Sequence, residues 1–428
     1  MTRAAGGALA PQRVPPSVLA RLARTRAAPD DLALLRRALH SRRLVLLKSL
    51  LTRLERQSDA VPVRVRERFE AHWRLLERAE SRHAPLVRDT LDYPAVGTWL
   101  AAVLAAPAGP AFAAGLGHFG AVAAAAALRS GTGFTVELAT PTGVLALPGI
   151  GLLETGRPLV RLTARSRTAR LTGPGTPHPA VLLRSAGGRV TGAGRGWRGL
   201  RRLPGGDALL DDLDPYRAPP GGVGRAALPP AGRDGTGGRP WTRRWRAALA
   251  LLRAADPERA AETGALLRCL VPVARPPGDP GAKVSATFRS APGAVLATLP
   301  PTAADLAEVL VHENQHSKLA VLHDLLPLHT AGPDALHRVA WRPDPRPLAG
   351  VLQGTYAHLA LADFWHRAVR GPALPPRARE GALERRDSYR RQVAEAVPIL
   401  LESNELTAAG RDFARGMERH LATLGRPG

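Results

Sequence analysis

The stretch LVHENQHSKLAVLHDLLPL, residues 310–328, carries the clearest chemical signal in the chain. It contains His312, Glu313 and His316 in the spacing HExxH. Side chains four residues apart lie on the same face of an α-helix, so the two imidazoles are able to bind one metal ion. Glu313 projects beside that ion, where a carboxylate moves a proton or holds a bound water. The stretch therefore predicts a metal-binding helix.

The flanking residues predict where this helix begins and ends. Thr302 and Asp305, in the sequence TAAD, form an approximate capping box with a shorter acidic arm than the usual glutamate. Pro327 is expected to end the helix. The apolar face is expected to consist of Leu306, Val309, Leu310 and Leu319.

The charge of the chain is strongly basic, with 60 Lys and Arg against 36 Asp and Glu. Only Lys48, Lys283 and Lys318 are lysines, and the chain also has 43 glycines and 40 prolines. This composition indicates a codon preference, so we expect the arginines to be spread over a solvated surface. A groove for an acidic peptide or a nucleic acid is the alternative. No RNA-recognition, zinc-finger or helix-turn-helix signature supports a nucleic-acid partner.

Cys269 is the only cysteine, which excludes an intramolecular disulfide and a thiolate metal cluster. It lies in the apolar run ALLRCLVPV and is expected to be buried. Any metal must therefore be held by histidines and carboxylates. The N-terminus lacks the apolar core of a signal peptide. Prolines interrupt the alanine-rich residues 101–128, so we expect no membrane span and a cytoplasmic protein.

We expect an α+β fold made of four consecutive regions. Residues 1–128 are predicted to be helical, residues 129–217 rich in β-structure, and residues 218–240 a flexible Gly/Pro/Arg loop. Residues 241–428 are predicted to form a mostly helical HExxH domain. In it the metal helix packs on a second long helix at residues 350–369, whose small residues permit close contact.

Finer patterns refine this expectation. The leucines of residues 31–56 suggest two packed helices separated at residues 41–43. Two short strands, 284–290 and 293–299, lead directly into the metal helix, which would place the metal at a sheet edge able to bind an extended peptide. Further helices are expected at 17–25, 65–80, 93–104, 241–253 and 258–270, and further antiparallel strands at 134–138, 143–147, 159–163 and 180–184.

The acidic sequence DDLDPY contains Asp211, Asp212 and Asp214. It is expected to form a turn before Pro215, and the alternatives are a contact to a basic peptide or a second metal site.

Two histidines need a third protein ligand to make a catalytic metal site. His323 is excluded on a continuous helix, because seven residues beyond His316 is about 10 Å along the axis. The chain between them also lacks the glycine at which a metzincin turns. His358 lies in the middle of the second long helix and is our preferred third ligand, with Asp363 and His329 as alternatives.

The sequence VAWRPDPRPL, residues 339–348, places Arg342 and Arg346 in a loop stiffened by three prolines. The guanidinium fork suits a carboxylate ligand. The alternative is a structural loop in which Asp344 neutralises both arginines.

Several segments together resemble the actinobacterial HEXXH motif domain family. They are SATFRSAPGAVLATLP, the HExxH stretch itself and AWRPDPRPLAGVLQGTYAHLALADFW, with YPAVGTWL and DDLDPY further upstream. The resemblance covers roughly residues 44–363. The family is associated with ribosomally made, modified peptides, and its members are described as 2-oxoglutarate-dependent peptide β-hydroxylases.

The resemblance implies that Fe(II) is held by His312, His316 and a downstream histidine, for which His358 is the matching candidate. Arg346, in preference to Arg342, would bind the distal carboxylate of 2-oxoglutarate, which is converted to succinate. Glu313 would orient a metal-bound group or a ligand histidine. The partners implied are a precursor peptide and possible further peptide-maturation enzymes. The usual triad of two histidines and one carboxylate would instead replace His358 by Glu313 or Asp363.

Two other functions fit HExxH. In a zinc metallopeptidase, Glu313 would be the general base for a zinc-bound water. The missing glycine turn counts against it. In a non-catalytic peptide-binding module, the motif would be structural, and His312→Ala would leave peptide binding intact.

Overall fold

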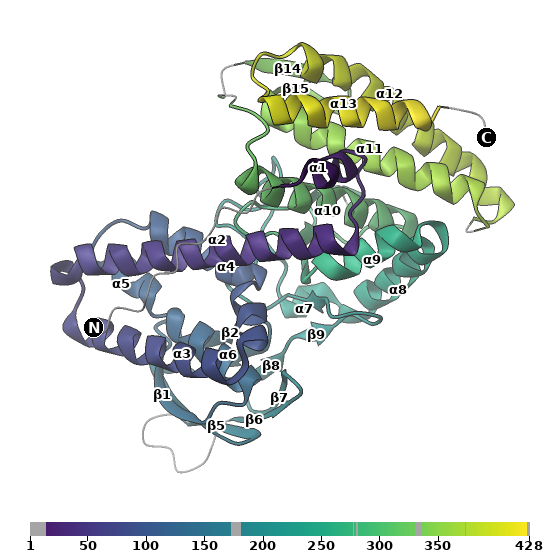
Figure 1. The fold of residues 1–428 in the computed structure, drawn as a ribbon. Coiled ribbons are helices and arrows are strands. Elements are labelled where there is room, and N and C mark those ends of the chain that lie inside the picture. Colours follow the sequence, from purple (N-terminus) through teal and green to yellow (C-terminus); the bar gives the residue numbers. More distant parts are fainter. Residues whose placement is uncertain are drawn as a thin grey trace. The chain divides into compact units, whose positions relative to one another are not determined.

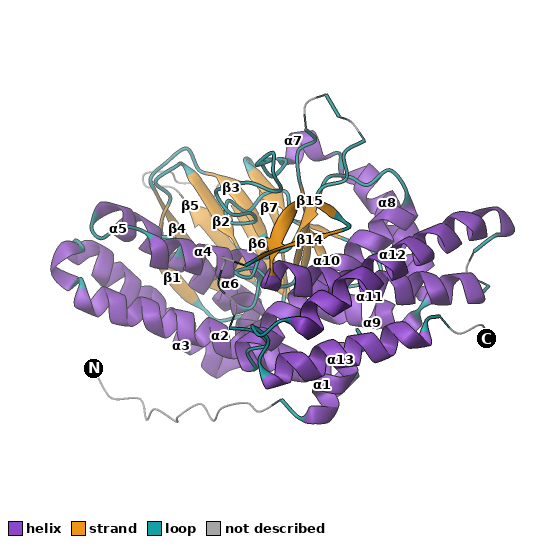
Figure 2. Ribbon diagram, turned by 90° about the horizontal axis from the view of Figure 1, so that it is seen from above, coloured by secondary structure: helices purple, strands orange, loops and turns teal. Residues whose placement is uncertain are grey.

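The computed structural model describes residues 14–425, except 173–180, 277, 280, 331, 333, 334 and 373. Helices and several β-sheets alternate along the chain, with helices before residue 131 and most strands between residues 134 and 210. The expected α+β fold, its helical N-terminal part and its β-rich middle are thereby confirmed (Figures 1 and 2).

The chain forms two compact units. Unit 1 comprises Met1–Ala38, Leu252–Glu262 and Gln315–Gly428, and unit 2 comprises Leu39–Leu251 and Thr263–Asn314. The boundaries expected at residues 128, 217 and 240 all fall inside unit 2. The units are therefore built from segments that are distant in the sequence.

In unit 2, two helices pack on each other and on an antiparallel sheet. Almost every residue of α6 (Phe119–Ser130) is buried, and its alanines let α3 (Val63–Leu91) approach closely. Trp99 is completely buried in α4 (Pro94–Ala105), as expected for a core anchor. The sheet has the order β1-β4-β5-β6-β7 (Figure 2). Its strands are β1 (Phe134–Ala139), β4 (Leu159–Arg165), β5 (Thr168–Thr172), β6 (Val181–Ala186) and β7 (Arg189–Gly194).

Residues 110–130 are long and apolar enough to cross a membrane by length and composition, the only such stretch among the described residues. In the structure they form α5 (Pro110–Leu116) and α6. Two thirds of the apolar window is buried within the protein, as in a core helix of a water-soluble domain.

A second sheet of unit 2 leads into the HExxH helix. Its order is β12-β13-β11-β10-β9, and β12 (Ser285–Ala286) pairs antiparallel with β13 (Ala294–Ala297), as predicted. The remaining strands are β11 (Cys269–Pro272), β10 (Leu209–Leu210) and β9 (Arg201–Arg202), and a small third sheet contains β2 (Val144–Leu147), β3 (Gly151–Glu154) and β8 (Trp197–Gly199).

Three sequence expectations were wrong in detail. The helix expected to run to residue 270 ends with α9 (Pro257–Leu266), and buried Cys269 begins β11. The break expected at residues 41–43 is absent, because α2 (Pro29–Arg56) is continuous. Serine and arginine do not end a helix as glycine or proline would. The segment 218–240 includes the short helix α7 (Arg233–Thr236) and the beginning of α8 (Gly238–Ala255), and so it is not a loop throughout.

Unit 1 is a helical bundle with a β-hairpin. The second long helix expected from the sequence is α11 (Leu348–Arg370), which packs closely on α12 (Pro376–Glu402) (Figure 1). The bundle also contains α13 (Ala408–Thr423) and α1 (Pro16–Ala23), which meet where a Cβ added to Gly416 would lie 2.6 Å from Ala23 Cβ. The hairpin consists of β14 (Leu336–Val339) and β15 (Arg342–Pro347).

Candidate functional site

The HExxH motif lies in α10 (Ala303–Leu325), whose start is fixed by the expected capping box. Asp305 N donates to Thr302 Oγ1, and Thr302 N donates to an Asp305 carboxylate oxygen, both over 3.1 Å. Lys283 Nζ, 2.7 Å from Asp305 Oδ1, neutralises the capping carboxylate. The helix ends two residues before Pro327. The predicted helix and both of its end signals are thus confirmed.

The two motif histidines lie one turn apart on α10 and are both half-buried. Val309 and Ala320 extend the same half-buried stripe, whereas the residues between the histidines are buried. Imidazole suits borderline ions such as Fe(II) and Zn(II). This face of α10 therefore presents two side chains that are suited to bind such an ion.

Glu313 is held in place from β12 in unit 2. It is 2% exposed, and Ser285 Oγ donates to its Oε1 over 2.7 Å. Thr287 Oγ1 donates to the Glu313 carbonyl over 3.4 Å. Glu313 Oε2 is buried and has no hydrogen-bond partner among the described residues. One carboxylate oxygen is thus fixed, and the other is available to a ligand or a proton.

Burial changes the acid–base properties of both residues. It raises the pKa of Glu313 to about 7, although the Ser285 and Thr287 hydroxyls act in the opposite direction. Burial lowers the pKa of His312 to about 4, so its imidazole is neutral near pH 7. A neutral imidazole is the form that binds a metal.

The strand that anchors Glu313 is the edge strand of its sheet. Thr298 N donates to Val284 O, so in the antiparallel register the backbone groups of residues 284 and 286 point toward β13. Those of Ser285 and Thr287 therefore point away from the sheet. The same two residues present their hydroxyls to Glu313.

His358 lies in the middle of α11 and is 7% exposed. Its ring lies 4.7 Å from the Trp341 ring, edge to face, and 5.3 Å from the Tyr389 ring. Among the described residues, no group of three or more His, Cys, Asp or Glu side chains is placed to hold a metal ion. The structure thus places the two motif histidines on one helix face, and their metal binding, with His358 as the third ligand, stays a prediction.

The two alternative third ligands have other neighbours. The Asp363 carboxylate is paired with Arg26 and Arg259. Burial alone would raise the pKa of Asp363, but the nearby His420 imidazole and the two arginines outweigh it and hold the pKa far below its usual range. The His329 ring lies 4.5 Å from the His323 ring.

The arginine-rich segment is a strand rather than the predicted loop. Arg342 and Arg346 belong to β15. They alternate with Asp344 along the strand, so the three side chains lie on the same side of the hairpin. Arg342 Nε and Nη2 contact the two Asp344 oxygens at 3.2 and 3.3 Å. Among the described residues, Arg346 contacts Asp344 through Nη1 alone, at 3.3 Å. Asp344 is thus the shared partner that the alternative interpretation expected, and Arg346 keeps two nitrogen positions for a further carboxylate.

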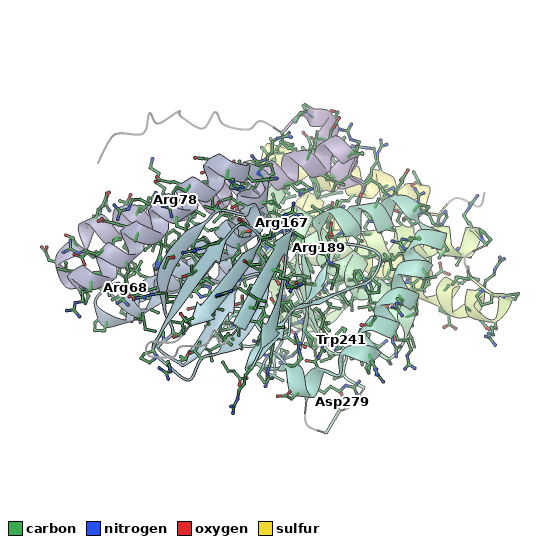
Figure 3. All side chains as sticks on the ribbon, turned by 90° about the horizontal axis from the view of Figure 1, so that it is seen from below. Arg68, Arg78, Arg167, Arg189, Trp241 and Asp279 are labelled. Atoms are coloured by element: carbon green, nitrogen blue, oxygen red, sulfur yellow. The ribbon has the colours of Figure 1, made fainter. Side chains whose placement is uncertain are left out.

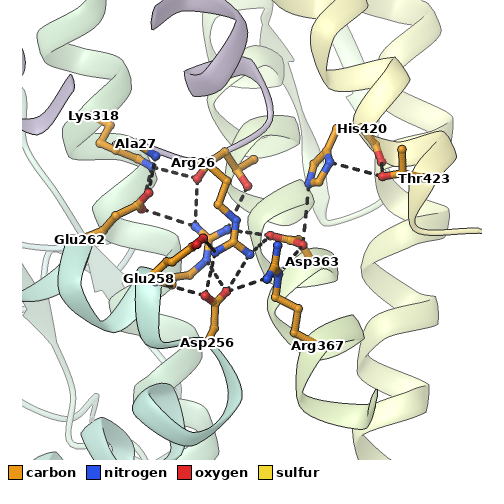
Figure 4. Close-up of polar contacts among 12 residues, drawn as sticks. Arg26, Ala27, Asp256, Glu258, Glu262, Lys318, Asp363, Arg367, His420 and Thr423 are labelled. Atoms are coloured by element: carbon orange, nitrogen blue, oxygen red, sulfur yellow. Dashed lines mark hydrogen bonds and ion pairs between the residues drawn. The ribbon is translucent and has the colours of Figure 1, made fainter. Parts of the chain in front are cut away.

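Unit 1 contains a buried ionic cluster that was not predicted from the sequence (Figure 4). Lys318 Nζ of α10 donates to Glu262 Oε2 and to the Thr25 carbonyl, both over 3.0 Å. Arg259, completely buried, lies 3.0 Å from Asp363. The detectable signal was the three-residue spacing of charges at residues 256, 259 and 262, at the start and in the first turns of α9.

The acidic sequence DDLDPY forms the expected turn. Asp211 Oδ1 accepts from Asp214 N over 3.0 Å, and Asp211 Oδ2 accepts from Tyr93 Oη over 2.7 Å. Asp212 is paired with Arg233 over 2.8 Å. These contacts give the acidic residues a structural role.

No protein-family model matches the chain, and no curated protein matches it significantly.

Proposed function

We propose that the protein is a non-haem Fe(II)/2-oxoglutarate-dependent enzyme that β-hydroxylates a residue of a ribosomally made precursor peptide. The observation that carries the proposal is the pair His312 and His316, half-buried on one face of α10 beside the anchored Glu313. The resemblance of residues 285–365 to peptide hydroxylases supports the choice of iron over other metals.

Each residue has a defined task in this proposal. His312 and His316 bind the metal through neutral imidazoles, with His358 as the proposed third ligand. Ser285 fixes Glu313, whose second oxygen orients a neighbouring ligand. Arg346, in preference to Arg342, binds the distal carboxylate of 2-oxoglutarate. Bound iron, with oxygen, would supply the oxidising chemistry: 2-oxoglutarate, O₂ and a peptide C–H yield succinate, CO₂ and a peptide C–OH.

The edge strand β12 suggests how a peptide would reach Glu313. Backbone groups of Ser285 and Thr287 point away from the sheet, and an extended peptide is able to pair with them as an added strand. Because the same residues contact Glu313, the peptide would run beside the HExxH helix. We propose a cytoplasmic enzyme that takes its precursor peptide from, or hands it to, other maturation enzymes, without a nucleic-acid or membrane partner.

A zinc metallopeptidase is the second candidate. The buried Glu313 Oε2, which lacks a hydrogen-bond partner within the described residues, suits a general base. Peptide cleavage rather than oxidation would then be the reaction.

Reconstitution of the apo-protein separates these functions. The protein is loaded anaerobically with Fe(II) or with Zn(II), then given 2-oxoglutarate, air and a candidate precursor peptide. We expect succinate with iron only, a peptide heavier by one oxygen, and loss of both in His316→Ala. Cleavage with zinc and no succinate with iron would establish the peptidase. Peptide binding that neither metal nor His312→Ala alters would establish a binding module.

A further inference from the structure

A pocket of about 550 Å³ lies in unit 2. Its lining residues fall between residues 82 and 188, so none of them belongs to the HExxH helix. Its walls are a kink of α3, the end of α6 and two hairpin turns, β4–β5 and β6–β7. Among the described residues that line it, none is acidic, and three are arginines: Arg82, Arg129 and Arg167.

The arginines are held so that positive charge remains at the pocket. Arg129 Nε donates to the Gly188 carbonyl over 3.1 Å, and its Nη2 pairs with Asp89 over 2.6 Å. Asp89 also neutralises Arg268, at 2.5 Å, so one carboxylate serves two guanidinium groups. The positive charge of Arg129 and Arg268 together is therefore only half balanced by Asp89.

The other two arginines are exposed at the pocket. Arg82 Nε donates to the Ser130 carbonyl over 3.2 Å. Within the described part of the chain, neither Arg82 nor Arg167 makes an ion pair. Arg167 and Arg189, both labelled in Figure 3, belong to the adjacent hairpins at this end of the sheet.

The pocket has a built shape. His83 interrupts α3 with φ −159° and ψ 75°, two residues before Pro85. Gly188, with φ +76°, lets the β6–β7 turn touch Leu86, since an added Cβ would lie 2.5 Å from Leu86 Cδ2. Ser166 adopts φ +54° in the opposite turn. A left-handed glycine thus lets the β6–β7 turn approach the kinked helix, and a left-handed serine shapes the β4–β5 turn that lines the same pocket.

The geometry points to a binding site for a small polyanion that carries at least two phosphate or carboxylate groups. Guanidinium forks bind either group through paired N–H donors, and the hydroxyls of Ser166 and Ser185 line the same pocket. The volume falls within the range of small-molecule sites. An anion would relieve the repulsion between Arg82, Arg129 and Arg167. This inference is independent of the function proposed for α10.

Calorimetric titration with pyrophosphate and with citrate, at constant ionic strength, tests the site and separates phosphate from carboxylate chemistry. We expect one saturable equivalent of at least one probe. Arg82→Ala/Arg167→Ala should weaken it at least about tenfold, because two charged donors are lost. The matched control Arg64→Ala/Arg68→Ala removes equal charge from α3, roughly 21 Å away along the helix, and should change affinity less than about twofold.

Three results would overturn the inference. The first is that neither probe binds. The second is equal weakening of binding by the two double variants, which would indicate diffuse attraction to a basic protein. The third is that hexaglutamate binds at least about tenfold more tightly than both probes, with loss in the pocket variant only, which would assign the pocket to an acidic chain. Circular dichroism of each variant confirms that the fold is kept.

Discussion

Asp214 and Asp363 show at the residue scale how surroundings decide the charge of a buried acid. Both are nearly inaccessible to solvent. Asp363 faces arginines and stays ionised, whereas burial, and then the neighbouring Asp211, raise the pKa of Asp214 to about 7. The residue type is the same, and the partners set opposite pKa shifts.

The raised pKa of Asp214 predicts that the difference in stability between the wild type and Asp214→Asn depends on pH. A folded pKa of about 7 exceeds the unfolded value of about 3.9, so the stabilisation is complete below pH 4 and is lost as pH rises through 7. Asp214→Asn stays neutral and keeps the Oδ1 acceptor for Tyr216 N. Between pH 5 and pH 8, the free energy of unfolding of Asp214→Asn, measured with urea, should rise relative to that of the wild type by at least about 1 kcal/mol.

The exposed Asp207, which pairs with Arg202, provides the control for this effect. Asp207→Asn should show no comparable pH-dependent change. A constant stability difference between Asp214→Asn and the wild type across the range would contradict the account.

At the element scale, the start of α10 depends on one side chain. Thr302→Ala removes the acceptor of Asp305 N and a donor to its carboxylate, which should cost about 1 kcal/mol of unfolding free energy. Thr302→Ser keeps the hydroxyl and should lose much less. Equal losses in the two variants, measured by chemical unfolding, would show that the cap does not determine this helix start.

The ionic cluster joins α9, α10 and the chain after α1 within unit 1. Lys318→Met removes a buried cation that donates to both Glu262 and the Thr25 carbonyl, which then keep only the contacts of Arg259 and other neighbours. The variant should destabilise the protein by about 3 kcal/mol. Lys318→Met/Glu262→Gln removes both charges and should recover part of that loss. A double variant as unstable as the sum of the single variants would contradict coupling between the pair.

Local signals predicted the elements whose causes are local. The TAAD cap and Pro327 gave both ends of α10, and the small residues of α11 were recognised as a helix face. The continuity of α2 also has a local cause, because serine and arginine do not end a helix as glycine or proline would. The ionic cluster has none, since Arg26 and Asp363 are 337 residues apart in the sequence. No short-range pattern contains that pairing.

The candidate site was predicted to a similar extent. The spacing of His312 and His316 and the helix that carries them followed from the sequence alone. The contact of Ser285 with Glu313 did not, because it requires the fold of β12 against α10. The third ligand depends on segments far apart in the chain, and for that reason His358 remains a prediction.

At the scale of the whole molecule, the arginine content is partly structural. Arg43 and Arg259 are completely buried, and arginines pair with acids throughout both units. The expectation that arginines are spread over a solvated surface therefore describes only part of them. Burial lowers the pKa of Arg43 to about 10. The remaining surface charge is the reason that every binding experiment on this protein needs fixed ionic strength.

The most direct test of the central claim is anaerobic titration of the apo-protein with Fe(II) and 2-oxoglutarate, followed by absorption and by metal analysis. We predict one bound iron per chain in the wild type and in His323→Ala. His323 lies on α10 as well, but about 10 Å beyond His316 along the helix axis, too far to bind the same ion. His312→Ala and His316→Ala should each lose this iron while keeping a folded circular dichroism spectrum. Full iron binding in both variants would contradict the assignment of α10 as the metal-binding helix.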